Sequence, residues 1–179
     1  KSKNVYGINI SISKNYIFGY TVLEKSGSYE ELKSKISGEY ENFFKLAKEN
    51  KMQIVKIWHY LPQLLKKHSN GKTNYSLLCE ARENIYKQYY NDIEFPAATA
   101  IGIEGNKILI YFLASLCKTY DAIENERQVS AYNYPQNIFL EKPMFSRAIK
   151  FSSQGYTDKK IVISGTASIR GYKSMHEME

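Results

Sequence analysis

Short apolar stretches in the first third of the chain alternate with polar turns in the manner of β-strands. Residues 5–12 and 16–23 lie on either side of the polar triplet 13–15, and this arrangement predicts a β-hairpin. Residues 53–60 form another short stretch rich in β-branched and aromatic side chains, which ends at Leu61 and Pro62. The N-terminal part of the chain therefore predicts three strands.

Two longer segments repeat their apolar positions at helical spacing. The first begins at Ser28, which together with Glu31 has the signature of a capping box. Apolar residues then recur on one helical face up to about residue 50, at Leu32, Ile36, Tyr40, Phe43 and Ala47. The second segment, residues 75–90, follows a polar loop and places Leu78, Arg82, Ile85 and Tyr89 on neighbouring turns.

Residues 97–104 and 107–116 predict two further strands. Gly105 and Asn106 join them with the strongest hairpin signal in the chain, so we expect these two strands to pair with each other. The resulting order is strand, strand, helix, strand, helix, strand, strand. This order is typical of an α+β fold, in which the helices lie apart from a mainly antiparallel or mixed sheet.

Composition narrows the class of protein. With 179 residues, 43% of them hydrophobic and only 4 prolines, the chain is typical of a soluble globular protein with one good-sized domain, or one domain and a fragment of another. It contains no apolar run near the ~18 residues that span a bilayer, and its lysine-rich start lacks the features of a signal peptide. We therefore expect a cytoplasmic protein without a membrane partner. Cys79 and Cys117 show no metal-ligand spacing, so we expect reduced thiols and neither metal nor cofactor.

The charge adds a weaker indication. The chain has 25 Lys and Arg against 18 Asp and Glu, a net charge of +7, but its lysines are spread along the whole sequence without a block of like charges. This pattern indicates a solvated surface with a mild attraction for anions. We do not expect a dedicated nucleic-acid site.

Candidate chemistry lies between residues 128 and 171. Arg147, in PMFSRAIKF, offers a planar guanidinium that can bind a carboxylate through two hydrogen bonds. The segment QVSAYNYP, read as the end of a strand, adds the hydroxyls of Tyr132 and Tyr134. Further along, Thr166 and Ser168 offer short donors near Gly165, where a ligand could approach the backbone. The alternative is a β-rich core filled with aromatic side chains.

Residues 128–148, QVSAYNYPQNIFLEKPMFSRA, resemble the signature of the chorismatase family, QVSAYxYPxxYGPxxPxFSRA. Other blocks agree in the same order. WHYLP at 58–62 resembles WNYLP, YSLLCEAR at 75–82 resembles YxxFCxGR, FPAATAIG at 95–102 resembles PAATGIG, and SGTASIRG at 164–171 resembles SGTASIVG. The order of these blocks makes the resemblance specific, although residues 136–142 depart from the family pattern.

The resemblance implies a fold of two fused RidA-like (chorismate mutase-like) domains, each a sheet backed by two helices. We expect residues 1–127 to form the first domain. Residues 128–179 would be a connecting motif and the beginning of a second RidA-like domain, apparently truncated. The strands within residues 143–171 would then find their remaining partners in a continuation of the chain. A monomer or a RidA-like oligomer is compatible with this fold.

The resemblance also implies an enzyme that converts chorismate to pyruvate and a dihydroxycyclohexadiene carboxylate or hydroxybenzoate. The family's proton-donating glutamate would lie beyond residue 179, so we identify no catalytic residue and expect the short chain to be inactive. For this dianionic substrate the resemblance implies a binding set, and its members are Arg147, Arg82, Tyr75, Tyr134, Ser146, Thr166 and Ala167. Arginines would bind the carboxylates, tyrosines would face the ring, and the small residues would form the floor.

Other titratable residues carry weaker signals. Arg82 is either a buried structural arginine or a carboxylate anchor, and Glu80 and Glu83 are too close in sequence to pair with it on a helix. His59 stands where the family has Asn, so we interpret it as a core histidine, and we expect His68 to be solvated. Cys79 lacks an activating histidine. Three glutamates lack the features of an acid catalyst: Glu104, Glu124 and Glu126. His176 resembles a family histidine.

Two alternative functions remain. A RidA-like protein that binds small molecules or hydrolyses imines would share the fold, but it has no reason to carry the WHYLP and YSLLCEAR blocks. A structural or nucleic-acid-binding domain would rest on charge alone, and its binding would weaken steeply with salt.

Overall fold

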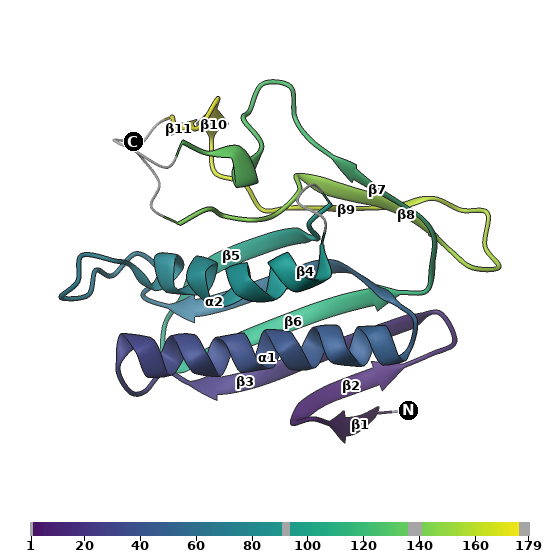
Figure 1. Ribbon diagram of the computed structural model, residues 1–179, viewed down its shortest axis with the longest axis horizontal. Coiled ribbons are helices and arrows are strands. Elements are labelled where there is room, and N and C mark those ends of the chain that lie inside the picture. The colour runs from purple at the N-terminus through teal and green to yellow at the C-terminus, as the bar shows by residue number, and fades with distance from the viewer. Residues whose placement is uncertain (1, 91–93, 136–140, 176–179) are drawn as a thin grey trace.

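The computed structural model describes residues 2–90, 94–135 and 141–175, and shows a large sheet, two helices on one of its faces and a smaller sheet (Figure 1). The large sheet has the order β1-β2-β3-β6-β4-β5. Its strands are β1 Ser2–Val5, β2 Ile8–Ile12, β3 Tyr16–Glu24, β4 Gln53–Pro62, β5 Ala97–Ile103 and β6 Lys107–Ser115. The helices are α1 Tyr29–Glu49 and α2 Asn74–Tyr89. The predicted α+β fold, a sheet backed by two helices, is confirmed.

The helices begin where the sequence predicts. Ser28 caps α1, and its hydroxyl accepts a hydrogen bond from the amide of Glu31, whose carboxylate accepts one from the amide of Ser28. Thr73 caps α2 in a similar way by accepting from the amide of Ser76. The predicted apolar face of α1 is buried against the sheet, so amphipathic spacing and capping together fix these helices.

The predicted hairpin between residues 97–104 and 107–116 is wrong. Both strands exist, but β4 lies between them: it pairs in parallel with β5 and antiparallel with β6. Gly105, at φ 94°, makes the turn, and the chain then crosses the end of β4. Because β4 is largely buried, its backbone needs hydrogen-bond partners along both edges, and β5 and β6 supply one edge each.

Two smaller expectations also need correction. The stretch 5–12 is not one strand, because Tyr6 and Gly7 have positive φ values of 55° and 81° and turn the chain between β1 and β2. The tyrosine-rich segment 128–135 is not the end of a strand. It contains instead a short 3-10 helix, Ala131–Asn133.

The smaller sheet has the order β7-β8-β9, formed by Cys117–Ile123, Ala148–Ser153 and Lys160–Ile163. The strands β8 and β9 fall within the predicted segment 143–171, whereas β7 was not predicted. This sheet packs on β4 and β5 through Val55, Ala97, Ile149 and Phe151. It therefore takes strands from both sides of the proposed boundary at residue 127, which stays a prediction. A short hairpin, β10 Ile169–Arg170 and β11 Lys173–Ser174, follows.

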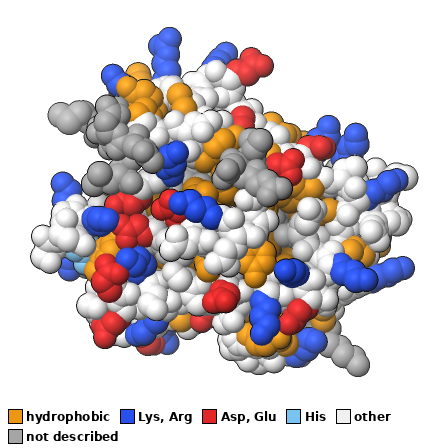
Figure 2. All heavy atoms as spheres, viewed as in Figure 1, with side chains coloured by type: hydrophobic (Ala, Val, Ile, Leu, Met, Phe, Trp, Pro, Cys, Tyr) orange, Lys and Arg blue, Asp and Glu red, His pale blue; other side chains and the backbone are white. Residues whose placement is uncertain are grey.

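The two faces of the large sheet differ. The helices cover one face (Figure 1), whereas the other exposes Phe18, Val22 and Ile101 by 43%, 44% and 44%. Phe18 stacks on Tyr111 there, with ring centroids 5.9 Å apart. On the helical face, basic and acidic side chains are interspersed (Figure 2), in agreement with the dispersed charge of the sequence. Within residues 2–90, 94–135 and 141–175, no helix is both long and apolar enough to span a membrane.

Candidate binding pocket

A cavity of about 590 Å³ lies between α2, the edge strand β5, the segment that connects β7 to β8 and the segment that follows β9. Six of the predicted site residues line it: Tyr75, Arg82, Tyr134, Arg147, Thr166 and Ala167. The helix contributes the first two, and the loops around residues 134, 147 and 166 contribute the others. Residues from two distant parts of the sequence therefore meet around one cavity. The seventh, Ser146, is fully buried beside the cavity and does not line it.

Arg82 is almost completely buried, at 2% exposure. Its Nη2 donates to the Sγ atom of Cys79 at 3.7 Å, and its guanidinium lies 5.9 Å from the ring centre of Tyr86. Its Nε has no hydrogen-bond partner, and the ion pairs of the described chain do not include Arg82. The expectation that Glu80 does not pair with it is confirmed, because Glu80 binds Lys33 and Lys72. A buried cation without a carboxylate lines the cavity.

His59 is a core histidine, as predicted, and is fully buried. Its Nδ1 lies 2.8 Å from the carbonyl oxygen of Thr99, so Nδ1 carries the proton and donates. Its Nε2 therefore accepts from the hydroxyl of Tyr40. Burial, followed by the charge of Arg82, lowers the pKa of His59 to about 3. The imidazole beside the cavity is thus neutral.

Arg147 is held by several acceptors from other segments. Its Nη1 donates to the hydroxyl of Thr166 at 3.2 Å, and its Nη2 donates to the carbonyl of Val129 at 3.1 Å and the hydroxyl of Tyr134 at 2.9 Å. The guanidinium also lies 5.0 Å from the ring centre of Phe145. Its Nε has no partner among the described residues. Arg147 therefore connects the segment 129–134 to Thr166, and its Nε donor stays unused within the described residues.

Tyr75 and Cys79 lie on the face of α2 that lines the cavity. Burial raises the pKa of the Tyr75 hydroxyl and of the Cys79 thiol, so both stay protonated at neutral pH. A thiol with a raised pKa is a poor nucleophile. The interpretation of Cys79 as a structural residue agrees with this environment.

Gly165 makes room for a neighbouring side chain, and the approach of a ligand to its backbone stays a prediction. Gly165 lines the cavity, but a Cβ placed on it would lie 2.8 Å from Cγ2 of Thr99. The missing side chain thus makes room for Thr99, and the amide of Gly165 donates to the Thr99 hydroxyl at 2.9 Å. Segment 164–167 leaves β9 and runs beside β5, to which Gly165 also donates through the carbonyl of Ala98 at 3.0 Å.

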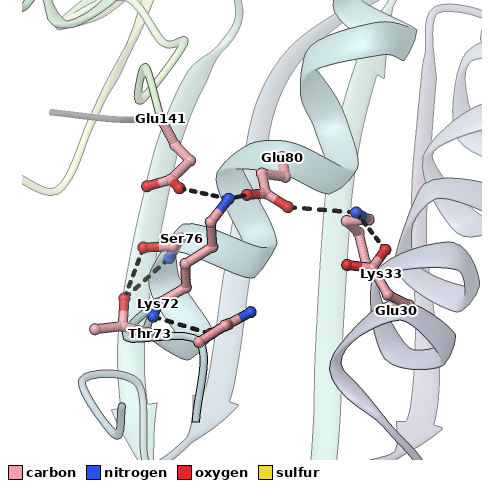
Figure 3. A network of polar contacts seen from close by, with 8 residues as sticks. Glu30, Lys33, Lys72, Thr73, Ser76, Glu80 and Glu141 are labelled. Carbon is pink, nitrogen blue, oxygen red and sulfur yellow. Dashed lines mark hydrogen bonds and ion pairs between the residues drawn. The ribbon is translucent and has the colours of Figure 1, made fainter. Parts of the chain in front are cut away.

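A chain of ion pairs lies at the rim of the cavity (Figure 3). Lys72 binds Glu80 on α2 and Glu141, whose carboxylate lies 3.1 Å from Nζ. Lys33 of α1 continues the chain from Glu80 to Glu30. Glu141 lines the cavity, and Lys72 connects it to α2. The other expectations for 136–142 concern residues 136–140, which lie outside the described residues.

The remaining candidates are placed as follows. Glu104 and Glu126 are exposed and away from the cavity. Glu124 is half-buried, and burial raises its pKa, although it accepts from the amide of Arg147 at 3.3 Å.

His68 is not simply solvated, since Nε2 lies 2.8 Å from Oδ1 of Asn74. Tyr132 packs against the main core, and Ser168 is exposed outside the cavity wall. His176 lies outside the described residues. The described residues contain no cluster suited to a metal ion.

Sequence reasoning missed three kinds of cavity residue. Thr99 and Ala100 lie within the FPAATAIG block, which resembles the family pattern but supplies no residue to the predicted binding set. Glu141 lies in segment 136–142, which departs from the family pattern, so a comparison of motifs assigns it no role. Ile169 and Tyr172 follow the SGTAS block. Thr99, Ala100 and Ile169 lie in blocks that resemble the family pattern and so carried a usable signal, whereas Glu141 and Tyr172 did not.

Comparisons with known proteins agree with this arrangement. The family described as "Chorismatase FkbO/Hyg5-like, N-terminal" matches residues 1–114. A 3-hydroxybenzoate synthase from Streptomyces hygroscopicus is 30% identical over 175 residues, which cover 96% of this chain and 51% of that protein. A chorismatase from Streptomyces rapamycinicus is 27% identical over 172 residues, which cover 95% of this chain and 51% of that protein.

A crystal structure of a chorismatase superimposes with a TM-score of 0.88 at 26% identity. The match covers 100% of this chain and 53% of that one. The chain thus spans about half the length of the curated relatives it matches. The resemblance predicted from the ordered sequence blocks is confirmed.

Proposed function

The chain belongs to the chorismatase family, and on that premise we propose that its cavity binds chorismate. We propose further that the whole protein converts chorismate to pyruvate and a ring carboxylate, either a dihydroxycyclohexadiene carboxylate or a hydroxybenzoate. Because the chain spans about half the length of its curated relatives, the conversion is assigned to the whole protein. Binding is assigned to the described cavity.

The presence of two buried arginines in one cavity carries this proposal. Arg82 and Arg147 are 2% and 8% exposed, and neither pairs with a carboxylate side chain in the described part of the chain. A buried cation is costly unless an anion balances it. Chorismate carries two carboxylates, so one ligand would balance both guanidinium groups.

The apolar wall suits the rest of the molecule. Tyr75 and Tyr134 would face the ring, and Thr166 with Ala167 would form the floor. Ser146 would act from behind the wall, since its carbonyl accepts from the hydroxyl of Ser164 at 2.5 Å. Ser164 in turn accepts from the amide of Ala98 at 2.8 Å. These contacts support the segment that carries Thr166.

The chemistry begins with a proton. Protonation of the methylene carbon of the enolpyruvyl ether produces an oxocarbenium-like carbon. Water, or a ring hydroxyl, attacks this carbon, and pyruvate is lost. Among the described residues that line the cavity, the only carboxylate belongs to Glu141, which Lys72 engages. We therefore assign proton donation to no residue of the described chain.

Calorimetric titration of the 179-residue chain tests the proposal. We expect one chorismate per chain, bound more tightly than benzoate, which keeps a ring and one carboxylate. The same sample should release no pyruvate above a heat-denatured control, because no described residue is assigned the proton. Absence of chorismate binding would contradict the proposal, and a preference for small 2-keto acids would favour the RidA-like alternative.

A further inference from the structure

Thr99, on the edge strand β5, lines the cavity and lies between two donors. The Nζ atom of Lys56 lies 2.6 Å from the Thr99 hydroxyl oxygen, and the amide nitrogen of Gly165 lies 2.9 Å from it. The amide distance is that of an ordinary hydrogen bond, and the ammonium contact is a short one. The hydroxyl oxygen therefore faces two donors, and the Gly165 amide shares its hydrogen between Thr99 and the carbonyl of Ala98, at 3.0 Å.

Neither donor can exchange roles with the hydroxyl at neutral pH. A backbone amide only donates. Lys56 is 2% exposed, and burial lowers its pKa to about 8, so at pH 7 its ammonium group predominates and has no lone pair. Its second hydrogen bond, to the carbonyl of Ile163 at 2.7 Å, connects the Lys56 side chain on β4 to the end of β9. The Thr99 hydroxyl is thus obliged to accept twice.

The remaining hydroxyl hydrogen has no acceptor within residues 2–90, 94–135 and 141–175. A threonine hydroxyl usually can both donate to a ligand and accept from it. Because both acceptor positions of the Thr99 hydroxyl are occupied, it can only donate to a ligand. Thr99 therefore adds a donor to a cavity whose two arginines also only donate. Around Thr99 and the two arginines, the wall therefore favours ligand atoms that accept hydrogen bonds.

We propose that Thr99 binds an acceptor oxygen of the ligand, and that Lys56 and the amide of Gly165 act as positioning groups that fix its hydroxyl as a donor. The inference rests on the proposed function, because it concerns the same cavity. The proposal gives the FPAATAIG block, which contains Thr99, a role in the recognition of oxyanion or ether oxygens of the ligand. A ligand that presents an amine or a donating hydroxyl at this point would be rejected, since two donors would meet.

Titration of chorismate into four forms of the whole chain tests the proposal: wild type, Thr99→Val, Thr99→Ser and Lys56→Met. Valine keeps the shape of threonine and favours a strand, but it lacks the hydroxyl. We expect Thr99→Val to weaken binding about tenfold or more, as for a lost hydrogen bond to a charged group. Thr99→Ser restores the hydroxyl and should stay within about threefold of wild type.

The pH dependence of affinity tests Lys56. Above its pKa of about 8 the neutral amine has a lone pair that can accept the Thr99 hydroxyl hydrogen. We therefore expect wild-type affinity to fall about threefold between pH 7 and pH 9.5, and Lys56→Met to lack this fall. The groups facing Lys56 are His59 and the Trp58 indole on its own strand, Thr99 on β5 and the Ile163 carbonyl on β9.

The possible outcomes separate the two proposals. If the wild-type chain binds chorismate and Thr99→Val binds it equally well while folded, the role of Thr99 is wrong and the proposed function stands. Should Thr99→Val fail to fold, Thr99→Ser and Lys56→Met decide whether Thr99 binds the ligand. A purely structural role would lower the melting temperature without changing the pH dependence of chorismate affinity. If the wild-type chain binds no chorismate, both proposals are wrong.

Discussion

Arg82 shows at the scale of one residue how a binding group opposes stability. Its guanidinium is buried among aromatic rings and a thiol, without a carboxylate partner in the described chain. Replacement of an uncompensated buried charge by an apolar residue of similar length is often neutral or stabilising. We expect Arg82→Met to leave the unfolding free energy unchanged or to raise it by about 1 kcal/mol, while chorismate binding weakens by at least about 2 kcal/mol.

Denaturant unfolding and calorimetric titration measure the two quantities for Arg82→Met. Arg127→Met, at an exposed position, is the matched control and should change neither. A loss of stability above about 3 kcal/mol with unchanged affinity would make Arg82 a structural arginine.

His59 gives a pH dependence of stability. Its pKa in the folded protein, about 3, lies below the unfolded value of about 6.5, so below pH 6.5 the unfolded chain binds a proton that the folded chain does not. The contribution of neutral His59 to the free energy of unfolding is therefore present above pH 6.5. It is lost as the pH falls, by about 2 kcal/mol at pH 5. In His59→Asn the decline between pH 7 and pH 5 should shrink by that amount, and in His68→Asn it should persist. Equal slopes in His59→Asn and wild type would show that His59 is protonated in the fold.

At the scale of the element, segment 164–167 packs closely against β5. A Cβ on Gly165 would lie 2.8 Å from Thr99 Cγ2, whereas one on Gly38 in α1 would meet nothing within 4 Å. We expect Gly165→Ala to cost about 1–3 kcal/mol by displacing this segment. Gly38→Ala should instead stabilise by about 1 kcal/mol, because glycine is unfavourable inside a helix. Thermal unfolding measures both, and equal effects would mean that the segment can move away freely.

At the scale of the whole molecule, stability depends on the contact between the two sheets. Phe151 on β8 is 1% exposed in the small core that also contains Val55 and Ala97 of the large sheet. We expect Phe151→Ala to lower the unfolding free energy by about 3–5 kcal/mol in a single transition. Ile163→Ala, on a side chain that is 72% exposed, should change it by less than about 0.5 kcal/mol. Two separate transitions in wild type would show that the sheets unfold independently.

The local elements could be predicted from sequence because their causes are local. Ser28 and Glu31 specify the start of α1 through bonds three residues apart, and the apolar face of that helix follows from its spacing. Strand pairing has no such local cause. The turn at Gly105 was predicted correctly, but the partners of β5 and β6 depend on β4, more than thirty residues earlier, which needs both of them.

The sequence by itself determined which residues could bind an anion, since a guanidinium fork and tyrosine hydroxyls are properties of side chains. It also determined the family, through motifs in a fixed order. The tertiary structure decided how these groups are used: Arg147 donates three hydrogen bonds to the protein from its Nη atoms, and Thr99 is left only to donate. Burial and hydrogen-bond partners arise from segments far apart in the chain, and no pattern of nearby residues contains them.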